Sequence, residues 1–281
     1  MVDFATASGW KRQPEKVSER QSLAVRRMPP ICIHLSIARE AADMLHHPII
    51  DQNLGSYLIG ATFPDVHIII ADSQREQTHF FDMEGKASES GVATLFKEYP
   101  NLACSENLDS STKSFVAGYL SHLVTDEVWI LDIYRPCFGV SSPLSQDPMA
   151  NILDRLLQFE LDCQERADRA KLEGIRVLVC DWEPRVRLDL IDIAALKRWQ
   201  GVVCTATTRE PNLAFFPHFA RRFLLPRHKI NPEQLEQFLS LLPAKVEWAI
   251  RYVTPERLTS FREKAISQSA VVAKEYLGED S

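Results

Sequence analysis

The longest helical pattern in the chain runs from about Ser110 to Tyr134 and stops before Pro136, because proline disfavours the helical conformation of the residue before it. Long segments rich in Leu, Ala, Glu, Lys and Arg recur elsewhere, and the 281 residues include only 10 glycines. Prolines mark several further helix ends. These features together predict an all-α protein folded as a single multi-helix bundle.

Similar patterns predict helices at about residues 33–45, 88–99 and 148–170. The pairs Asn231–Pro232 and Thr254–Pro255 each place a capping side chain before a proline, which is the preferred order at a helix start. Pro243 predicts a kink or break between those two starts. Residues 54–78 indicate short helical pieces and loop. The stretch EGIRVLVCDWEPRVRL is the one place where the pattern favours a small β hairpin.

The charge is unevenly distributed along the chain. Residues 1–27 hold six Lys and Arg against three acidic residues, so their formal charge is +3. Because the formal net charge of the whole chain is −6, the remaining residues carry −9. We expect a flexible basic extension there, or a true translation start at Met28, followed by one domain over residues 28–281. The acidic body argues against general nucleic-acid binding, because such proteins concentrate Lys and Arg on one face.

No apolar run approaches the roughly 18 to 20 residues needed to span a bilayer, and no apolar core of a signal peptide begins the chain. The expected location is therefore the cytoplasm. No CxxC pair occurs among the cysteines, which favours reduced thiols over a disulfide framework or a cysteine zinc site. The six cysteines are Cys32, Cys104, Cys137, Cys163, Cys180 and Cys204.

The sequence GYLSHLVTDEVW places His122 and Asp126 four residues apart inside the long apolar helix. Their side chains leave the same face, about 6 Å apart at Cβ, and could bind one ion. Alternatively, His122 donates a hydrogen bond to Asp126 as a satisfied polar pair in the core. Glu127 falls off this face, which indicates a solvated or supporting group.

Three other potential ligands stand in apolar or turn-rich contexts: His34 in CIHLSIA, Asp65 in GATFPD and His79 in QTHFFD. With His122 and Asp126 they form a set of nitrogen and oxygen donors suited to zinc. Each also has an ordinary interpretation, since Asp65 could cap a turn and His79 could pack beside the phenylalanines that follow it. Structural roles are expected for His46, His47, His67 and His228, while His218 in FFPHFARRF is left open.

The order and spacing of His34, Asp65, His79, His122 and Asp126 resemble the zinc-dependent phospholipase C family. That family is related to the single-strand-specific zinc nucleases and to the N-terminal domain of the glycosylphosphatidylinositol-specific phospholipase D proteins. The resemblance covers about residues 29–139. It implies an all-α fold of the phospholipase C type that holds up to three zinc ions in a cleft and hydrolyses phosphodiester bonds.

The resemblance implies a first zinc site made by Asp65, His79, His122 and Asp126. It also implies that Asp126 bridges to a second zinc shared with His34 and, in the secreted enzymes, with the amino-terminal residue. Here the sequence begins well before His34 and no cleavage signal precedes it, so the amino-terminal ligand is not expected, and Cys32 is a candidate substitute.

The third zinc site departs further from the family. Asp132 stands where the family has a histidine, and the stretch PCFGVSSPLSQDP contains neither the histidine nor the glutamate that should follow. Glu160, Asp162 or His218 would have to come in from elsewhere in the fold. One to three zinc ions are therefore expected.

The resemblance predicts a phosphodiesterase that attacks a phospholipid or small diester with a metal-bound hydroxide, with Asp65 orienting or deprotonating the water. The alternative is a non-catalytic helical protein with a structural zinc, because closed four-ligand sites are usually structural. A nuclease is disfavoured by the acidic body and by the lack of an evident basic and aromatic groove. An HD-type phosphohydrolase is disfavoured because no His-Asp dipeptide occurs.

Overall fold

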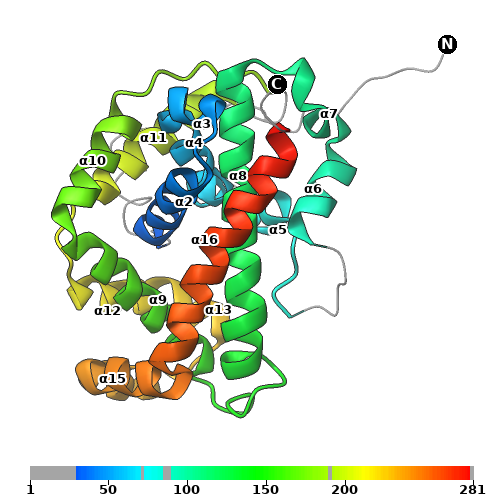
Figure 1. Ribbon diagram of the computed structural model, residues 1–281. Coiled ribbons are helices and arrows are strands. Elements are labelled where there is room, and N and C mark those ends of the chain that lie inside the picture. Colours follow the sequence, from blue (N-terminus) through cyan, green and yellow to red (C-terminus); the bar gives the residue numbers. More distant parts are fainter. Residues whose placement is uncertain (1–29, 71–72, 85–89, 189–191, 279–281) are drawn as a thin grey trace.

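The computed structural model describes residues 30–70, 73–84, 90–188 and 192–278, and every regular element in these ranges is helical (Figure 1). The predicted all-α fold is confirmed. The basic extension and the alternative start at Met28 lie outside the described residues. Within those residues no helix is both long enough and apolar enough to cross a membrane.

The first half of the chain contains the helices that carry the predicted ligands. In chain order they are α2 (Ile31–Leu45), α3 (Pro48–Gln52), α4 (Leu54–Gly60), the 3-10 helix η1 (Phe63–Ile69), α5 (Glu76–His79), α6 (Gly91–Glu98), α7 (Pro100–Ala103), the 3-10 helix η2 (Ser105–Asn107), α8 (Ser110–Trp129) and the π helix η3 (Ile130–Phe138).

The second half packs around these elements. Its helices are α9 (Ala150–Ala167), α10 (Arg169–Cys180), α11 (Ile193–Thr208), the 3-10 helix η4 (Leu213–Phe215), α12 (Phe216–Phe219), the π helix η5 (Ala220–Leu224), α13 (Leu225–His228), α14 (Pro232–Ser240), α15 (Leu242–Val253) and α16 (Pro255–Leu277).

Helices α2 and α8 lie at the centre, and α16 runs beside both of them (Figure 1). One side of α2, with Ile31 and Leu35, packs into a core shared with α4, α8 and α11. The other side, with Ile33 and Ile37, packs into a second core formed with η3, α9 and the C-terminal helices. Because both sides are covered, any polar side chain on the first turns of α2 is buried as well.

Two glycines let α4 lie directly against α8. A Cβ atom on Gly118 would come within 1.9 Å of the Tyr57 carbonyl oxygen, and one on Gly60 within 2.1 Å of the Phe115 carbonyl oxygen. Only glycine permits two backbones to approach this closely. The contact brings the chain just after α4 against the middle of α8.

The predicted helix ends are mostly confirmed at the C-terminal end of the chain. Asn231 caps α14 through Oδ1, which accepts from the N–H of Glu233 at 2.8 Å, and the Thr254 hydroxyl caps α16. Pro243 lies in the first turn of α15, so it marks the break between α14 and α15.

Pro136 does not end the central helical segment, contrary to the prediction. The α-helical hydrogen bonding of α8 stops at Trp129, and the chain continues as η3 to Phe138. Pro136 lacks the N–H that another α-helical turn would need. The wider π turns carry the chain through it, and the segment closes with a 2.8 Å bond from the N–H of Gly139 to the carbonyl of Tyr134.

The expected hairpin is also wrong, because its first half belongs to α10. Leu172, Ile175 and Val179 form the buried side of this helix. Their spacing of three and four residues follows the helical period rather than the alternation of a strand. Tertiary packing against α11 thus decides the structure of a segment rich in β-branched residues.

Two cysteines do not fit the expectation of six thiols. Cys180 at the end of α10 and Cys204 on α11 form a disulfide, with their Cα atoms 5.6 Å apart. The free cysteines are Cys32, Cys104, Cys137 and Cys163. The expectation is therefore wrong for the pair that joins α10 to α11.

Candidate metal centre

Four separate elements bring five potential ligands together. His34 comes from α2, Asp65 from η1, His79 from α5, and His122 and Asp126 from α8. Two overlapping sets have ligand atoms within 4.8 Å of one another: His34, Asp65 and His122, and His79, His122 and Asp126. His122 is 1% exposed whereas the Asp126 side chain is 25% exposed, so solvent approaches the cluster from the Asp126 side.

Backbone carbonyls fix the orientation of two histidines. His122 Nδ1 lies 2.9 Å from the carbonyl oxygen of Ala61, which the close approach of α4 and α8 positions, and His79 Nδ1 lies 3.2 Å from that of Arg75. A carbonyl oxygen only accepts, so Nδ1 carries the hydrogen in both rings and Nε2 carries the lone pair. The two Nε2 atoms face each other at 3.2 Å.

Burial keeps these imidazoles neutral. Desolvation, followed by the neighbouring His34, lowers the pKa of His122 to about 3, and desolvation together with Arg75 lowers the pKa of His79. Two neutral nitrogen lone pairs that point at each other are favourable only when a cation lies near both. The pair therefore has the donor geometry of a metal site.

Two further polar atoms in the cluster lack partners. Asp65 Oδ2 and His34 Nδ1 are buried and make no hydrogen bond among the described residues, while Asp65 Oδ1 lies 3.4 Å from His79 Nε2. An unsatisfied buried carboxylate oxygen costs free energy that an ion would recover. These orphaned atoms show that the donor set fits a metal such as zinc.

Asp126 is ionised and shared between partners. Its Oδ1 lies 3.4 Å from His34 Nε2, and its Oδ2 lies 3.5 Å from His79 Nε2 and 2.5 Å from Arg75 Nη2. Although burial favours the neutral acid, the Arg75 guanidinium outweighs it and holds the pKa of Asp126 well below its usual range.

Supporting hydrogen bonds come partly from the C-terminal half of the chain. Trp199 on α11 donates from Nε1 to the Thr62 hydroxyl at 3.0 Å, just before η1 and Asp65. Tyr119 on α8 donates to the carbonyl of Thr78 at 2.6 Å, beside His79. The cluster is therefore held by α8 and α11 together.

Asp132, the candidate for a further site, is not brought to this cluster. It lies six residues beyond Asp126, so it points to another side of the helical segment, and its Oδ2 pairs with Lys264 Nζ at 2.7 Å. Cys32 lies two residues before His34 and faces away, with its thiol toward Ala206 and its N–H donating to Asp162. Burial and then the Asp162 charge raise the pKa of this thiol.

The remaining open candidates do not join either ligand set. Asp162 pairs with Arg166, Glu160 accepts from Gln164, and His218 is exposed on α12. Glu127 accepts a hydrogen bond from the N–H of Gly91 at 3.1 Å, outside the cluster.

One residue of the site, Arg75, is not among the residues predicted from the sequence. Its guanidinium contacts Asp126 and its carbonyl orients His79. It lies in the polar stretch SQREQT, within the segment that was predicted to be short helical pieces and loop. The available signal was its position four residues before His79, which places both side chains on one side of a helical turn.

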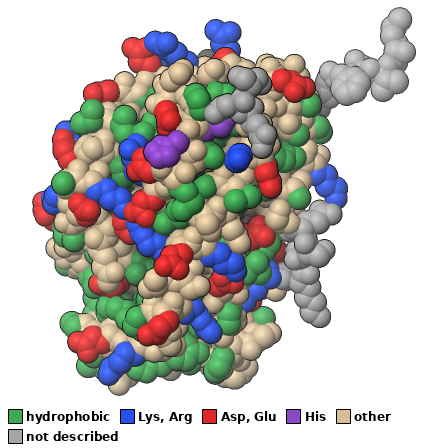
Figure 2. All heavy atoms as spheres, viewed as in Figure 1, with side chains coloured by type: hydrophobic (Ala, Val, Ile, Leu, Met, Phe, Trp, Pro, Cys, Tyr) green, Lys and Arg blue, Asp and Glu red, His purple; other side chains and the backbone are tan. Residues whose placement is uncertain are grey.

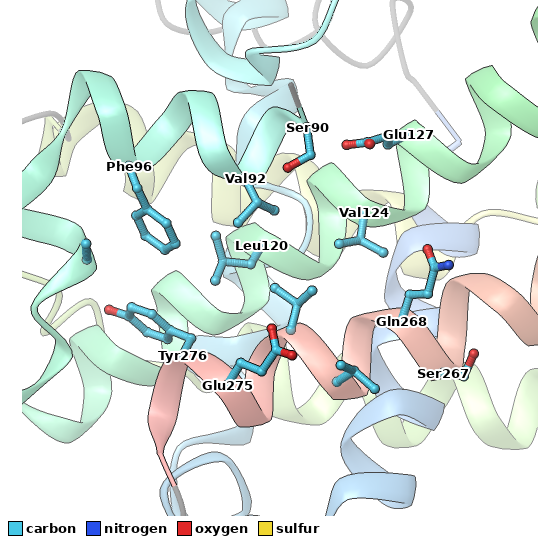
Figure 3. Close-up of a pocket in the computed structure, with 13 residues that line it drawn as sticks. Ser90, Val92, Phe96, Leu120, Val124, Glu127, Ser267, Gln268, Glu275 and Tyr276 are labelled. Carbon is cyan, nitrogen blue, oxygen red and sulfur yellow. The ribbon is translucent and has the colours of Figure 1, made fainter. Parts of the chain in front are cut away.

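A separate cavity of about 620 Å³ lies between α6, α8 and α16 (Figure 3). Helix α8 contributes Leu120, Val124 and Glu127 to its wall, and these point away from the side that carries His122 and Asp126. The cavity is large enough for a small ligand, yet it lies across α8 from the metal cluster.

Charged side chains of both signs are interspersed over the face that carries α16 (Figure 2). This face shows no broad basic area of the kind that phosphate backbones require.

Residues 33–129 match the family model described as zinc dependent phospholipase C. The matched segment contains all five clustered ligands, so the resemblance suspected from their order is confirmed over these residues. No curated protein and no solved structure matches the chain. The family match and the His and Asp clusters support a zinc-dependent hydrolase similar to phospholipase C.

Proposed function

We propose that this protein is a zinc-dependent phosphodiesterase that hydrolyses a phospholipid or a related small diester. The observation that supports this proposal most strongly is the pair of facing Nε2 atoms of His79 and His122, 3.2 Å apart, each with its Nδ1 held by a carbonyl. Such an arrangement suits a metal cation better than a hydrogen bond.

The residues that would hold a first zinc ion are Asp65, His79, His122 and Asp126, with His34 beside Asp126. Zinc bound there would supply a Lewis acid for the phosphoryl oxygens and would lower the pKa of a water molecule toward neutral pH. The nearly complete burial of the three histidines strengthens these electrostatic effects, because little water competes for the charges.

Asp65 is the proposed proton acceptor, because a carboxylate can bind a metal ion through one oxygen and accept a proton on the other. In this mechanism the water oxygen forms a new bond to phosphorus, and the bond from phosphorus to the alcohol oxygen breaks. Asp65 takes the proton of the water and returns a proton to the departing alcohol. The substrate would approach from the side of Asp126, which is the most exposed of the ligand side chains.

A structural zinc site is the second candidate function. The burial of His34, Asp65, His79 and His122 favours it, because closed sites with protein ligands only are usually structural. The two functions predict the same metal content and differ in turnover.

Turnover of a chromogenic phosphodiester by chelator-treated protein, with and without added zinc, tests the proposal. Zinc should restore hydrolysis to the wild type and to His218→Ala, a control that removes an exposed histidine. His122→Ala should lose both zinc and hydrolysis. Firmly bound zinc without turnover of any diester would support the structural site, and a wild type that binds no zinc would refute both functions.

A further inference from the structure

Arg75 places a fixed positive charge at the entrance of the metal cluster. Its side chain is 14% exposed, and Nη2 lies 2.5 Å from Asp126 Oδ2. Its Nη1 donates to the carbonyl of Phe81 at 3.3 Å. The guanidinium is therefore held from two sides at the edge where solvent reaches Asp126.

The described residues use only part of the hydrogen-bonding capacity of this guanidinium. An arginine has five N–H groups, and within the described ranges only two of its nitrogens bond to the protein, Nη1 to Phe81 and Nη2 to Asp126. The flat fork of an arginine matches the oxygens of a phosphate and can bind two of them at once. A diester that approaches the cluster past Asp126 would meet these donors.

The same charge opposes a second metal ion on the outer side of Asp126. The guanidinium occupies the surroundings of Oδ2, and two cations close to one carboxylate oxygen repel each other. Asp126 Oδ1, which lies 3.4 Å from His34 Nε2, has no such cation among the described residues, whereas Oδ2, which lies 3.5 Å from His79 Nε2, is shared with the guanidinium. One ion beside the imidazoles and one guanidinium outside them is the arrangement with the least repulsion.

We propose that Arg75 binds the phosphoryl oxygens of the substrate and takes the place of a second metal ion, so that the site uses one metal ion and one guanidinium. This inference rests on the proposed function. It assigns the anion-binding group of the site and a stoichiometry of one metal per chain.

Arg75→Met tests the inference because it removes the charge and keeps a long side chain. Zinc content is measured by elemental analysis, and the affinity of the zinc-loaded protein for inorganic phosphate by calorimetry. The wild type should hold one zinc, and Arg75→Met should keep at least that zinc while binding phosphate about 10- to 100-fold more weakly. Arg75→Lys, which keeps the charge without the fork, should fall between them.

Arg39→Met is the matched control, since Arg39 pairs with Asp43 on the surface of α2, and it should change neither quantity. If Arg75 only held Asp126 in place, Arg75→Met would lose zinc instead of phosphate affinity, which would overturn the inference. Equal phosphate affinities of wild type and Arg75→Met, or two zinc ions in the wild type, would also overturn it while leaving the proposed function intact. A wild type that binds no zinc would refute both the inference about Arg75 and the proposed function.

Discussion

His122 links the packing of the fold to the chemistry of the site. Its Nδ1 faces the carbonyl of Ala61, whose position depends on the contact between α4 and α8, and its Nε2 faces His79. The ring is 1% exposed, so it cannot turn toward water. The position of this one side chain therefore depends on the packing of α4 against α8 and also determines the geometry of metal binding.

The stability of the metal-free protein should depend on pH through His122. Its pKa is about 3 in the folded chain and about 6.5 in an unfolded one. Below pH 6.5 the unfolded chain takes up a proton that the folded chain does not. The free energy of unfolding should therefore fall as the pH drops from about 6.5 toward 3, by up to about 1.4 kcal/mol per pH unit for this group.

Urea unfolding of chelator-treated protein between pH 7 and 4.5 measures this dependence. His122→Asn removes the titrating ring, so its unfolding free energy should fall less steeply with pH than that of the wild type. Carboxylates remote from His122 contribute equally to both proteins and cancel in the comparison, whereas Asp65 and Asp126 contribute to the difference together with His122. Parallel pH profiles would contradict the assignment of His122 as a buried neutral imidazole.

At the scale of helices, the contact between α4 and α8 depends on the absence of a side chain at two positions. Gly118→Ala would place a Cβ atom 1.9 Å from the Tyr57 carbonyl oxygen. The helices must then separate, and we expect a loss of about 1 to 3 kcal/mol in the free energy of unfolding. Because Ala61 moves with α4, zinc affinity should fall as well.

Gly201→Ala is the matched control for this change. Gly201 lies inside α11, and nothing lies within 4 Å of a Cβ atom placed there. Alanine should therefore stabilise α11 by about 0.5 to 1 kcal/mol. Urea unfolding measures the free energy of unfolding of both variants. A Gly118→Ala protein as stable as Gly201→Ala would contradict the close contact between α4 and α8.

A buried ion pair joins α9 to the start of α2. Asp162 Oδ1 accepts from the N–H of Cys32 at 2.7 Å, and its Oδ2 accepts from Arg166 Nε at 2.7 Å. Asp162→Ala would leave the Arg166 charge buried without its partner, which typically costs about 3 to 5 kcal/mol. Thermal and urea unfolding measure the loss.

Two comparisons make this prediction specific. Asp43→Ala removes a surface carboxylate paired with Arg39 and should cost at most about 1 kcal/mol. The double variant Asp162→Ala, Arg166→Met should be more stable than Asp162→Ala alone, because no unpaired charge remains. A single variant as stable as Asp43→Ala would refute the role of the pair in anchoring α2.

At the scale of the whole molecule, the sequence predicts the parts of the fold that depend on local signals. The Asn231 and Thr254 caps mark helix starts correctly, and the order of the five ligands predicts their meeting, because it follows a family pattern. The extent of the single domain over residues 28–281 stays a prediction.

Features that depend on distant contacts could not be predicted. The helical form of α10 depends on its packing against α4 and α11. Likewise, Arg75 becomes a site residue only because its guanidinium meets Asp126, which lies 51 residues further along the chain. The spacing of four residues from His79 was a local signal, but that spacing alone does not predict a contact with a residue on another helix.

The X-ray absorption spectrum of the zinc-loaded protein tests most directly the claim that zinc is held by the imidazoles and carboxylates between α2, α5 and α8. We predict nitrogen and oxygen ligands at about 2.0 to 2.2 Å, with imidazole scattering that is lost together with the zinc in His122→Ala. Sulfur ligands at about 2.3 Å would contradict this claim, as would a spectrum and zinc content unchanged in His122→Ala, because zinc would then be bound elsewhere.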